Sequence, residues 1–360
     1  MPGIYISWPF CAQKCTYCNF ASGVLPRDLE PRYLDALLRQ IAIHRWQFTP
    51  QTIYLGGGTP SGAEAGHIAR ILAALPGAPW REATIEAAPG TLTRARVEEW
   101  QRAGINRVSL GVQSFVRQEL ARTGRKHNAE IVAADISLLR EHGIHNINID
   151  LIAGLPGQTD ASWEESFAAM LRLDPPHVSV YMLEVDDDSR LGAEILLGGK
   201  RYGASDVPSE DRIADFYETA VERLRAHGIE RYEISNFARP GAESLHNLKY
   251  WKREPYIGFG ADAHSFDGSS RWQNVETAQE YVDSESPRRD ESSPDAGEEK
   301  FFVGLRLSEG VRTDAADWHR FGPAFERFLS DGLLERSDGN LRLTPRGVML
   351  SNEVFQEFVA

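Results

Sequence analysis

The stretch CAQKCTYCNF, residues 11–20, decides how this 360-residue chain is interpreted. It holds Cys11, Cys15 and Cys18, which are all the cysteines of the sequence. A disulfide could use only two of them, and thiolates crowded into one short loop are typical of a metal centre. Three thiolates can hold three irons of a four-iron cluster. The fourth iron then stays open to a ligand, as the metal does in catalytic zinc sites.

Zinc is the alternative metal for this loop. Zinc modules commonly combine one CxxC pair with a second pair, or with histidines further along the chain. The spacing here is C-x3-C-x2-C, and the sequence has no second cysteine pair. The pattern therefore favours an iron–sulfur site, and a structural zinc-binding module stays open as the weaker hypothesis.

Composition narrows the class of protein. With 42% hydrophobic and 25% charged residues, the chain suits one large globular domain or two unequal ones. We expect no transmembrane segment, because no run of about twenty apolar residues exists. The start MPGIYISWPF lacks the features of a secretory signal, and clustered reduced cysteines indicate the cytoplasm. A net charge of −13 argues against nucleic acid as a partner.

Strand and helix patterns alternate through the first half of the chain. Strand-like runs are expected at residues 3–7, 52–55, 83–87, 107–110, 147–150 and 178–181. Helical patterns fall at 30–46, 65–75, 93–103, 129–142 and 161–173. This alternation predicts parallel strands joined by helices, and six units predict a partial TIM-like (β/α)6 barrel. The carboxyl ends of its strands would build the active site.

The remaining chain predicts an extension and a small second domain. A helix is expected at 211–227 and a strand at 232–238, while the polar, Pro- and Ser-rich residues 283–299 indicate a linker. Helices followed by a hairpin at Asp338-Gly339 favour a winged-helix-like α+β domain. The predicted domains are a core barrel over 1–182, a barrel extension over 183–282, the linker over 283–299 and a C-terminal domain over 300–360.

Five motifs accompany the cysteine loop in order: YISWPFC at 5–11, GGGTP at 56–60, GINRVSLGVQSF at 104–115, DLIAGLPGQT at 150–159 and HNLKYW at 246–251. Together they resemble the radical S-adenosylmethionine (SAM) superfamily. Within it they are similar to the oxygen-independent coproporphyrinogen III oxidase-like family and its heme chaperone branch, HemW. The resemblance implies a 4Fe-4S cluster on the three cysteines. It also implies SAM chelating the open iron, with cleavage to a 5′-deoxyadenosyl radical as the available chemistry.

The resemblance also implies site residues. Gly57, Gly58 and Thr59 would meet the methionine part of SAM, Tyr5 would lie near the cluster, and Tyr17 would lie beside the adenine. Further polar contacts to SAM carry over to Glu86, Gln113, Arg125 and Asp150. A carboxylate suits ribose hydroxyls, and an arginine suits the SAM carboxylate. A residue of this kind taken alone is more often a surface or helix-capping residue, but the shared position of these residues at strand ends favours a functional role.

The HNLKYW motif predicts a second site. A lone histidine is more often structural than a ligand. Two aromatic neighbours nevertheless offer flat apolar surface to a planar macrocycle, and the family resemblance implies heme binding here. We therefore predict that His246 takes part in binding heme. Basic side chains suited to the heme propionates follow at Lys249, Lys252 and Arg253.

Three features distinguish this chain from its relatives. Two separate it from the decarboxylating oxidases, and the third separates it from both the oxidases and the heme chaperones. The oxidases carry a fourth cysteine where Phe20 stands and a longer segment ahead of Tyr5, so both differences favour the heme chaperone. Ser7 occupies a position where both groups usually have histidine, which puts any proton-transfer role there in doubt.

The resemblance implies a heme chaperone that delivers heme to respiratory membrane proteins, and we expect it to reach the membrane only through those partners. Coproporphyrinogen III oxidase activity, a radical SAM oxidative decarboxylation, is the alternative function. The sequence leaves open whether SAM is cleaved, which axial ligand heme uses, and whether the chain forms a homodimer.

Overall fold

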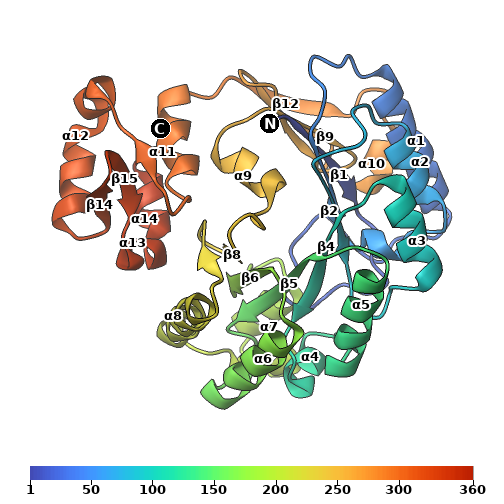
Figure 1. The fold of residues 1–360 in the computed structure, drawn as a ribbon, viewed down its shortest axis with the longest axis horizontal. Helices are drawn as coiled ribbons and strands as arrows, with labels where there is room; N and C mark the ends of the chain where they lie inside the picture. The colour runs from blue at the N-terminus through green and yellow to red at the C-terminus, as the bar shows by residue number, and fades with distance from the viewer. Residues whose placement is uncertain (360) are drawn as a thin grey trace.

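The computed structural model describes residues 1–359. Six parallel strands in sequence order form the core of a twelve-stranded sheet, which curves into an incomplete barrel (Figure 1). They are β1 (Gly3–Trp8), β2 (Thr52–Gly57), β3 (Glu82–Ala87), β4 (Arg107–Gln113), β5 (Asn146–Ala153) and β6 (His177–Met182). The α/β partial barrel expected from the strand–helix alternation is confirmed.

Helices cover the outer face of these strands (Figure 1). They are α1 (Leu29–Ile43), α2 (His67–Ala73), α3 (Arg94–Ala103), α4 (Arg117–Arg122), α5 (Ala129–Glu141) and α6 (Asp160–Leu173). On β5, Ile147, Ile149 and Leu151 are fully buried. Because side chains alternate along a strand, these residues face the helices and leave the alternate positions for the barrel interior. The hydrophobic core therefore lies outside the barrel, and the interior is polar.

One side of the sheet continues past β6. Helices α7 (Arg190–Leu196) and α8 (Glu210–Ala226), with the 3-10 turn η2 (Arg201–Asp206), lead to the antiparallel strands β7 (Glu230–Arg231) and β8 (Asn236–Ala238). The strand expected over 232–238 is shorter than predicted. The backbone N–H groups of Tyr232 and Glu233 both donate to the Asn236 carbonyl, which makes a turn there.

The other side of the sheet continues past β1. Strand β9 (Tyr256–Phe259) pairs parallel with β1, and β10 (His264–Phe266), β11 (Arg271–Asn274) and β12 (Arg288–Ser292) follow antiparallel. Helices α9 (Leu245–Trp251) and α10 (Ala278–Asp283) precede and interrupt this run. The segment 283–299, expected as a linker, differs from that expectation because β12 joins the main sheet and α11 begins at Ala296.

The C-terminal part carries its own three-stranded sheet. It contains α11 (Ala296–Gly304), β13 (Val311–Arg312), α12 (Ala315–Ser330), β14 (Leu334–Ser337), β15 (Asn340–Leu343), α13 (Pro345–Met349) and α14 (Ser351–Gln356). The β14–β15 hairpin turns at Asp338 and Gly339, both with positive φ, as the Asp-Gly pair predicts. In the same part of the chain, the rings of Phe301, Phe325 and Phe358 pack against one another.

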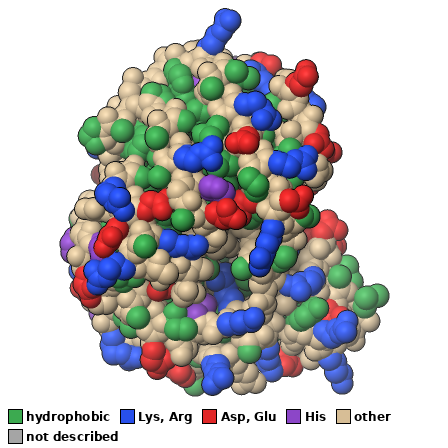
Figure 2. Space-filling model, turned by 90° about the vertical axis from the view of Figure 1, so that its right-hand side faces the viewer, with side chains coloured by type: hydrophobic (Ala, Val, Ile, Leu, Met, Phe, Trp, Pro, Cys, Tyr) green, Lys and Arg blue, Asp and Glu red, His purple; other side chains and the backbone are tan. Residues whose placement is uncertain are grey.

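The length of the helices and the distribution of surface charge bear on contact with membranes and with charged partners. Among residues 1–359, no helix combines the length and the apolar character that crossing a bilayer requires. On the face drawn in Figure 2, acidic and basic side chains are interspersed, and the basic ones form no continuous stripe there.

Candidate functional site

The cysteine loop follows β1 at the carboxyl end of the barrel strands. Its ends are tied together, because the Cys11 N–H donates to the Gly23 carbonyl (2.9 Å) and the Gly23 N–H donates to the Pro9 carbonyl (2.9 Å). Thr16 fixes the centre of the loop, since its carbonyl accepts from the Leu191 N–H at the start of α7 (2.8 Å). All three cysteines are free thiols of intermediate exposure. The fold thus presents them together on one anchored loop.

The three thiols are the candidate metal ligands of this loop. In a four-iron cluster each thiolate binds a different iron. Burial raises the pKa of the Cys11 thiol, and the Thr59 hydroxyl partly offsets that rise.

The glycine motif lies directly against this loop. The Gly58 N–H donates to the Trp8 carbonyl and the Thr59 N–H donates to the Phe10 carbonyl, both at 2.8 Å. A Cβ added at Gly58 would stand only 2.8 Å from these same two oxygens. Gly57 has a φ of +103°, a backbone conformation that glycine adopts without strain. The backbone of the glycine motif therefore packs directly on the backbone that leads into the cysteine loop, and a side chain at position 58 would push that loop away.

Two carboxylates line the barrel interior below the loop. Glu86 accepts a hydrogen bond from the Tyr54 hydroxyl (2.9 Å), and Asp150 accepts from Asn148 (2.6 Å) and from the Ser109 hydroxyl (3.3 Å). Burial raises the pKa of Glu86 to about 7, and the nearby Asp150 adds to the rise. Burial also raises the pKa of Asp150, while its hydrogen bonds oppose the change. Asp150 lies inside β5 rather than at its end, because the strand runs three residues further than expected.

Arg125 and Gln113 carry polar atoms that the protein leaves without partners. The Arg125 guanidinium donates to the Gly111 carbonyl (2.5 Å) and to the Tyr17 hydroxyl (3.3 Å), but its Nε has no acceptor. The buried Gln113 Oε1 also lacks a donor, and this residue has a φ of +69°. Orphaned buried polar atoms and a strained backbone are both more frequent at ligand sites than elsewhere. These residues therefore fit a polar ligand such as SAM beside the cysteine loop.

His246 lies elsewhere, on α9 inside the barrel (Figure 1). Its side chain is fully buried, and both ring nitrogens have partners. Nδ1 lies 2.9 Å from the Thr52 hydroxyl and 2.6 Å from the Lys249 Nζ, and Nε2 lies 2.7 Å from the Tyr250 hydroxyl. Burial is the main cause that lowers the pKa of His246, and the nearby Lys249 charge lowers it further. Burial also lowers the pKa of Lys249. The ring therefore has no nitrogen free for a metal in this arrangement.

Helix α9 is fixed at the amino end of the barrel strands. The Glu82 carboxylate accepts from the Ser244 hydroxyl (3.2 Å) and from the N–H groups of Leu245 and His246 (both 2.9 Å). Thr52 and Glu82 are the first residues of β2 and β3. Since the cysteine loop follows the carboxyl end of β1, α9 closes the opposite end of the barrel. We call Leu245–Trp251 the plug.

The structure thus divides the predicted residues into two groups. The glycine motif, Glu86, Gln113, Arg125 and Asp150 lie on the strands and loops at the cysteine end, and Tyr5 stacks on Tyr54 within the barrel (ring centroids 6.2 Å apart). His246 belongs to the plug. Ser7, standing in place of histidine, is buried with its side chain near Gly57.

Sequence reasoning missed three interior residues that hold the site together: Tyr54, Glu82 and Ser109. The signal for Glu82 and Ser109 was present in the sequence, because polar side chains recur at every second position of β3, β4 and β5, whereas Tyr54 lies on β2. That alternation indicates a polar interior facing a ligand.

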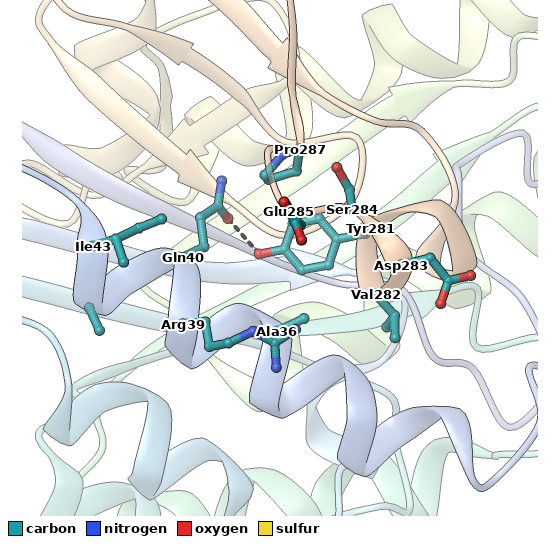
Figure 3. A pocket seen from close by; sticks show the side chains of 11 residues that line it. Ala36, Arg39, Gln40, Ile43, Tyr281, Val282, Asp283, Ser284, Glu285 and Pro287 are labelled. Atoms are coloured by element: carbon teal, nitrogen blue, oxygen red, sulfur yellow. Dashed lines mark hydrogen bonds between the residues drawn. The ribbon is translucent and has the colours of Figure 1, made fainter.

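A separate hollow of about 420 Å³ lies between α1 and α10 (Figure 3). The Tyr281 hydroxyl there donates to Gln40 Oε1 (2.5 Å), and Ile43 and Val282 line the sides. The hollow is lined by residues 36–43 of α1 and by residues 281–287, and none of the candidate site residues lines it. The hollow therefore belongs to the packing of outer helices and not to the candidate site.

Comparison with known proteins identifies the family. The sequence profile of the radical SAM superfamily matches residues 5–170, and the HemN C-terminal domain profile matches residues 292–350. Heme chaperone HemW of Bacillus subtilis is 35% identical over 100% of this chain and 99% of its own length. The chain belongs to the HemW family. HemW of Escherichia coli is 31% identical over 99% of the chain and 98% of its own length.

The HemW-family chain also shares its fold with a solved structure. Coproporphyrinogen III oxidase (HemN) of Escherichia coli, described as a radical SAM enzyme, superposes with a TM-score of 0.82. The match covers 99% of this chain and 89% of that chain at 21% identity, so it shows the fold alone. Membership of the HemW family accounts for the order of motifs along the chain.

Proposed function

We propose that this HemW-family chain is a heme chaperone that holds a 4Fe-4S cluster and SAM at the cysteine end of its barrel. The observation that carries this proposal is the three-thiol loop packed against the glycine motif, with unpartnered atoms of Gln113 and Arg125 beside it. The relatives in Bacillus subtilis and Escherichia coli bear the name heme chaperone, which supports the same function here.

In this proposal each residue at the cysteine end of the barrel has a defined role. Cys11, Cys15 and Cys18 hold three irons, and backbone groups of the GGGTP motif orient the methionine part of SAM. Arg125 suits the SAM carboxylate, and the Glu86 carboxylate suits the ribose hydroxyls. When bound, the cluster supplies the electron that cleaves a carbon–sulfur bond of SAM. The protein contributes orientation and a site shielded from water.

Heme is the cargo in this proposal, and the plug is the segment proposed to contact it. The buried His246 would have to leave its bonds to Thr52, Lys249 and Tyr250 before it could ligate iron. A His246→Ala variant is therefore expected to bind heme more weakly and with a changed spectrum. A Thr52→Val variant, which removes one restraint on the ring, is expected to bind heme at least as tightly as wild type. Unchanged heme affinity and spectrum in His246→Ala would exclude this role.

The acceptors proposed for the heme are respiratory membrane proteins, and contact with the membrane would run through them. The protein itself would be cytoplasmic. The deciding experiment is anaerobic cluster reconstitution followed by heme titration with and without SAM, monitored by absorbance. We expect saturable heme binding and no turnover of added coproporphyrinogen III. Failure to bind heme would contradict the chaperone function, and multiple turnovers of the porphyrinogen would favour the oxidase.

A further inference from the structure

Arg107 is a buried charged residue whose guanidinium keeps one N–H without an acceptor in the protein. It lies on β4 and is 1% exposed. Its Nε has no hydrogen-bond acceptor, and none of the ion pairs formed among residues 1–359 includes Arg107. The Asp150 carboxylate is already held by Asn148 and Ser109 and makes no hydrogen bond to Arg107. Burial raises the pKa of Asp150 and the nearby Arg107 charge lowers it, so the two groups interact through their charges. The Nε–H is nevertheless left without an acceptor, and a buried donor without an acceptor is costly.

The two strands beside β4 carry unsatisfied polar atoms at the same level. Thr84 of β3 and Asn146 of β5 are both in register with Arg107. Thr84 Oγ1 and Asn146 Oδ1 are buried and lack hydrogen-bond partners. Because the oxygen and nitrogen of an asparagine amide exchange places by a simple flip, this amide can present a donor to the same point. Three neighbouring strands thus leave polar groups unsatisfied at one level of the barrel interior.

This level lies between the plug and the cysteine end. One pleat toward the plug, Thr52 and Glu82 bind α9. One pleat toward the cysteine loop, Glu86 is in register with Ser109. A ligand that enters from the open cysteine end would therefore meet Arg107 before it reached the plug. The position suits the far end of a bound molecule whose reactive or central part lies nearer the cluster.

We propose that Arg107, Thr84 and Asn146 form an anion site that binds a carboxylate of the ligand held inside the barrel. A guanidinium fork matches the two oxygens of one carboxylate, and a hydroxyl and an amide complete its hydrogen bonds. The single positive charge of Arg107 matches the one negative charge of a carboxylate better than the two of a phosphate, and the neighbouring groups Glu86 and Asp150 supply no further positive charge. If the proposed chaperone function holds, the carboxylate is a propionate of the tetrapyrrole. That identification rests on the proposed function, whereas the anion site does not.

The first arm of the test uses propionate ion alone. The melting temperature of the full-length protein is measured in sodium propionate and in sodium chloride at matched ionic strength. Propionate should raise the wild-type melting temperature by about 2 °C relative to chloride, because a ligand of the native state stabilises it. Arg107→Gln should lose this difference, and Arg107→Lys should keep part of it. Thr84→Val, an isosteric variant that preserves folding, should reduce it. Equal responses of wild type and Arg107→Gln would overturn the anion site.

The second arm tests the identity of the carboxylate. Heme and heme dimethyl ester, in which both propionates are esterified, are titrated into wild type and Arg107→Gln. Wild type should prefer heme by about tenfold to a hundredfold, the usual effect of a charge-assisted hydrogen bond, and Arg107→Gln should show no preference. Equal binding of heme and ester by wild type would overturn the propionate assignment. Absence of heme binding by wild type, with a positive propionate arm, would contradict the proposed function and leave the anion site standing.

Discussion

The two ends of the barrel differ in whether their buried polar side chains find hydrogen-bond partners within the protein. At the cysteine end, Gln113 and Arg125 keep buried polar atoms without protein partners, and the thiols are partly exposed. At the plug, His246 and Glu82 have their side-chain nitrogens and oxygens bonded within the protein. A polar group left unsatisfied on burial reduces stability, whereas one that is fully paired fixes the structure. The comparison therefore indicates a site prepared for ligands at the cysteine end, whereas at the plug Glu82 and His246 are held by protein partners. The plug still keeps one buried atom without a partner, the Nε1 of Trp251.

The largest effect is expected from removing one thiolate of the loop. Cys15→Ser should lower the affinity for the cluster by about a hundredfold or more, because even residues that only support metal ligands cost ten- to a hundredfold in affinity when lost, and the iron content after anaerobic reconstitution should fall well below that of wild type. Iron and zinc analysis would measure this change. The plug should be unaffected, so the melting temperature of the protein without iron should match that of wild type. Iron retained at the wild-type level would contradict the assignment of the loop.

A substitution at Gly3, which lies against the plug, tests how tightly the plug is packed. A Cβ at Gly3 would overlap the Lys249 Nζ and the Thr52 hydroxyl, so Gly3→Ala should lower the free energy of unfolding by about 2 kcal/mol. Chemical denaturation would measure this loss. Gly23→Ala is the matched control, since a Cβ there meets no atom within 4 Å. A Gly3→Ala variant as stable as this control would show that the plug is not tightly packed.

The glycine motif is expected to act on ligand binding more than on stability. Gly58→Ala would press on the Phe10 and Trp8 carbonyls and displace the cysteine loop, so SAM affinity should fall about tenfold. Isothermal titration of the reconstituted protein would measure it. Gly62→Ala, whose Cβ meets only a Thr59 methyl group at 3.8 Å, serves as the control. Equal SAM affinity in both variants would exclude contact between the motif and the ligand.

The smallest effect concerns the protonation of Glu86. With a pKa of about 7, its ionised fraction rises from about a tenth at pH 6 to about nine tenths at pH 8. SAM carries positive charge, so wild-type affinity should rise about fivefold over this range, and Glu86→Gln should remove the rise. Stability changes in the opposite sense. Because the folded pKa lies above the ordinary value of 4.5, the free energy of unfolding should fall as pH rises from 4.5 through 7. A flat affinity profile in wild type would exclude a role for the Glu86 charge.

The sequence predicts the cysteine end far better than it predicts the plug. Strands β1 to β6 follow from alternating patterns and glycine or proline breaks, and parallel order brings their carboxyl ends together without further information. The burial of His246 could not be foreseen. It depends on Glu82, 164 positions earlier in the chain, capping α9, and on Thr52 meeting the histidine ring. Long-range partners of this kind leave no local pattern.

The segment 283–299 shows a related limit of sequence reasoning. Its composition is that of a linker, and every residue of β12 is exposed. The strand forms nevertheless, because β11 offers an unpaired edge to which the backbone of Arg288–Ser292 can bond. Backbone pairing requires no apolar side chains at a sheet edge, so hydrophobic periodicity could not indicate it.

The central claim is that the three thiolates leave one iron open for SAM at the cysteine end of the barrel. Electron paramagnetic resonance of the reduced, anaerobically reconstituted protein, recorded with and without SAM, tests it most directly. The account predicts a 4Fe-4S signal whose g-values change when SAM is added. A protein that contained zinc, or a cluster signal identical in the presence and absence of SAM, would contradict it.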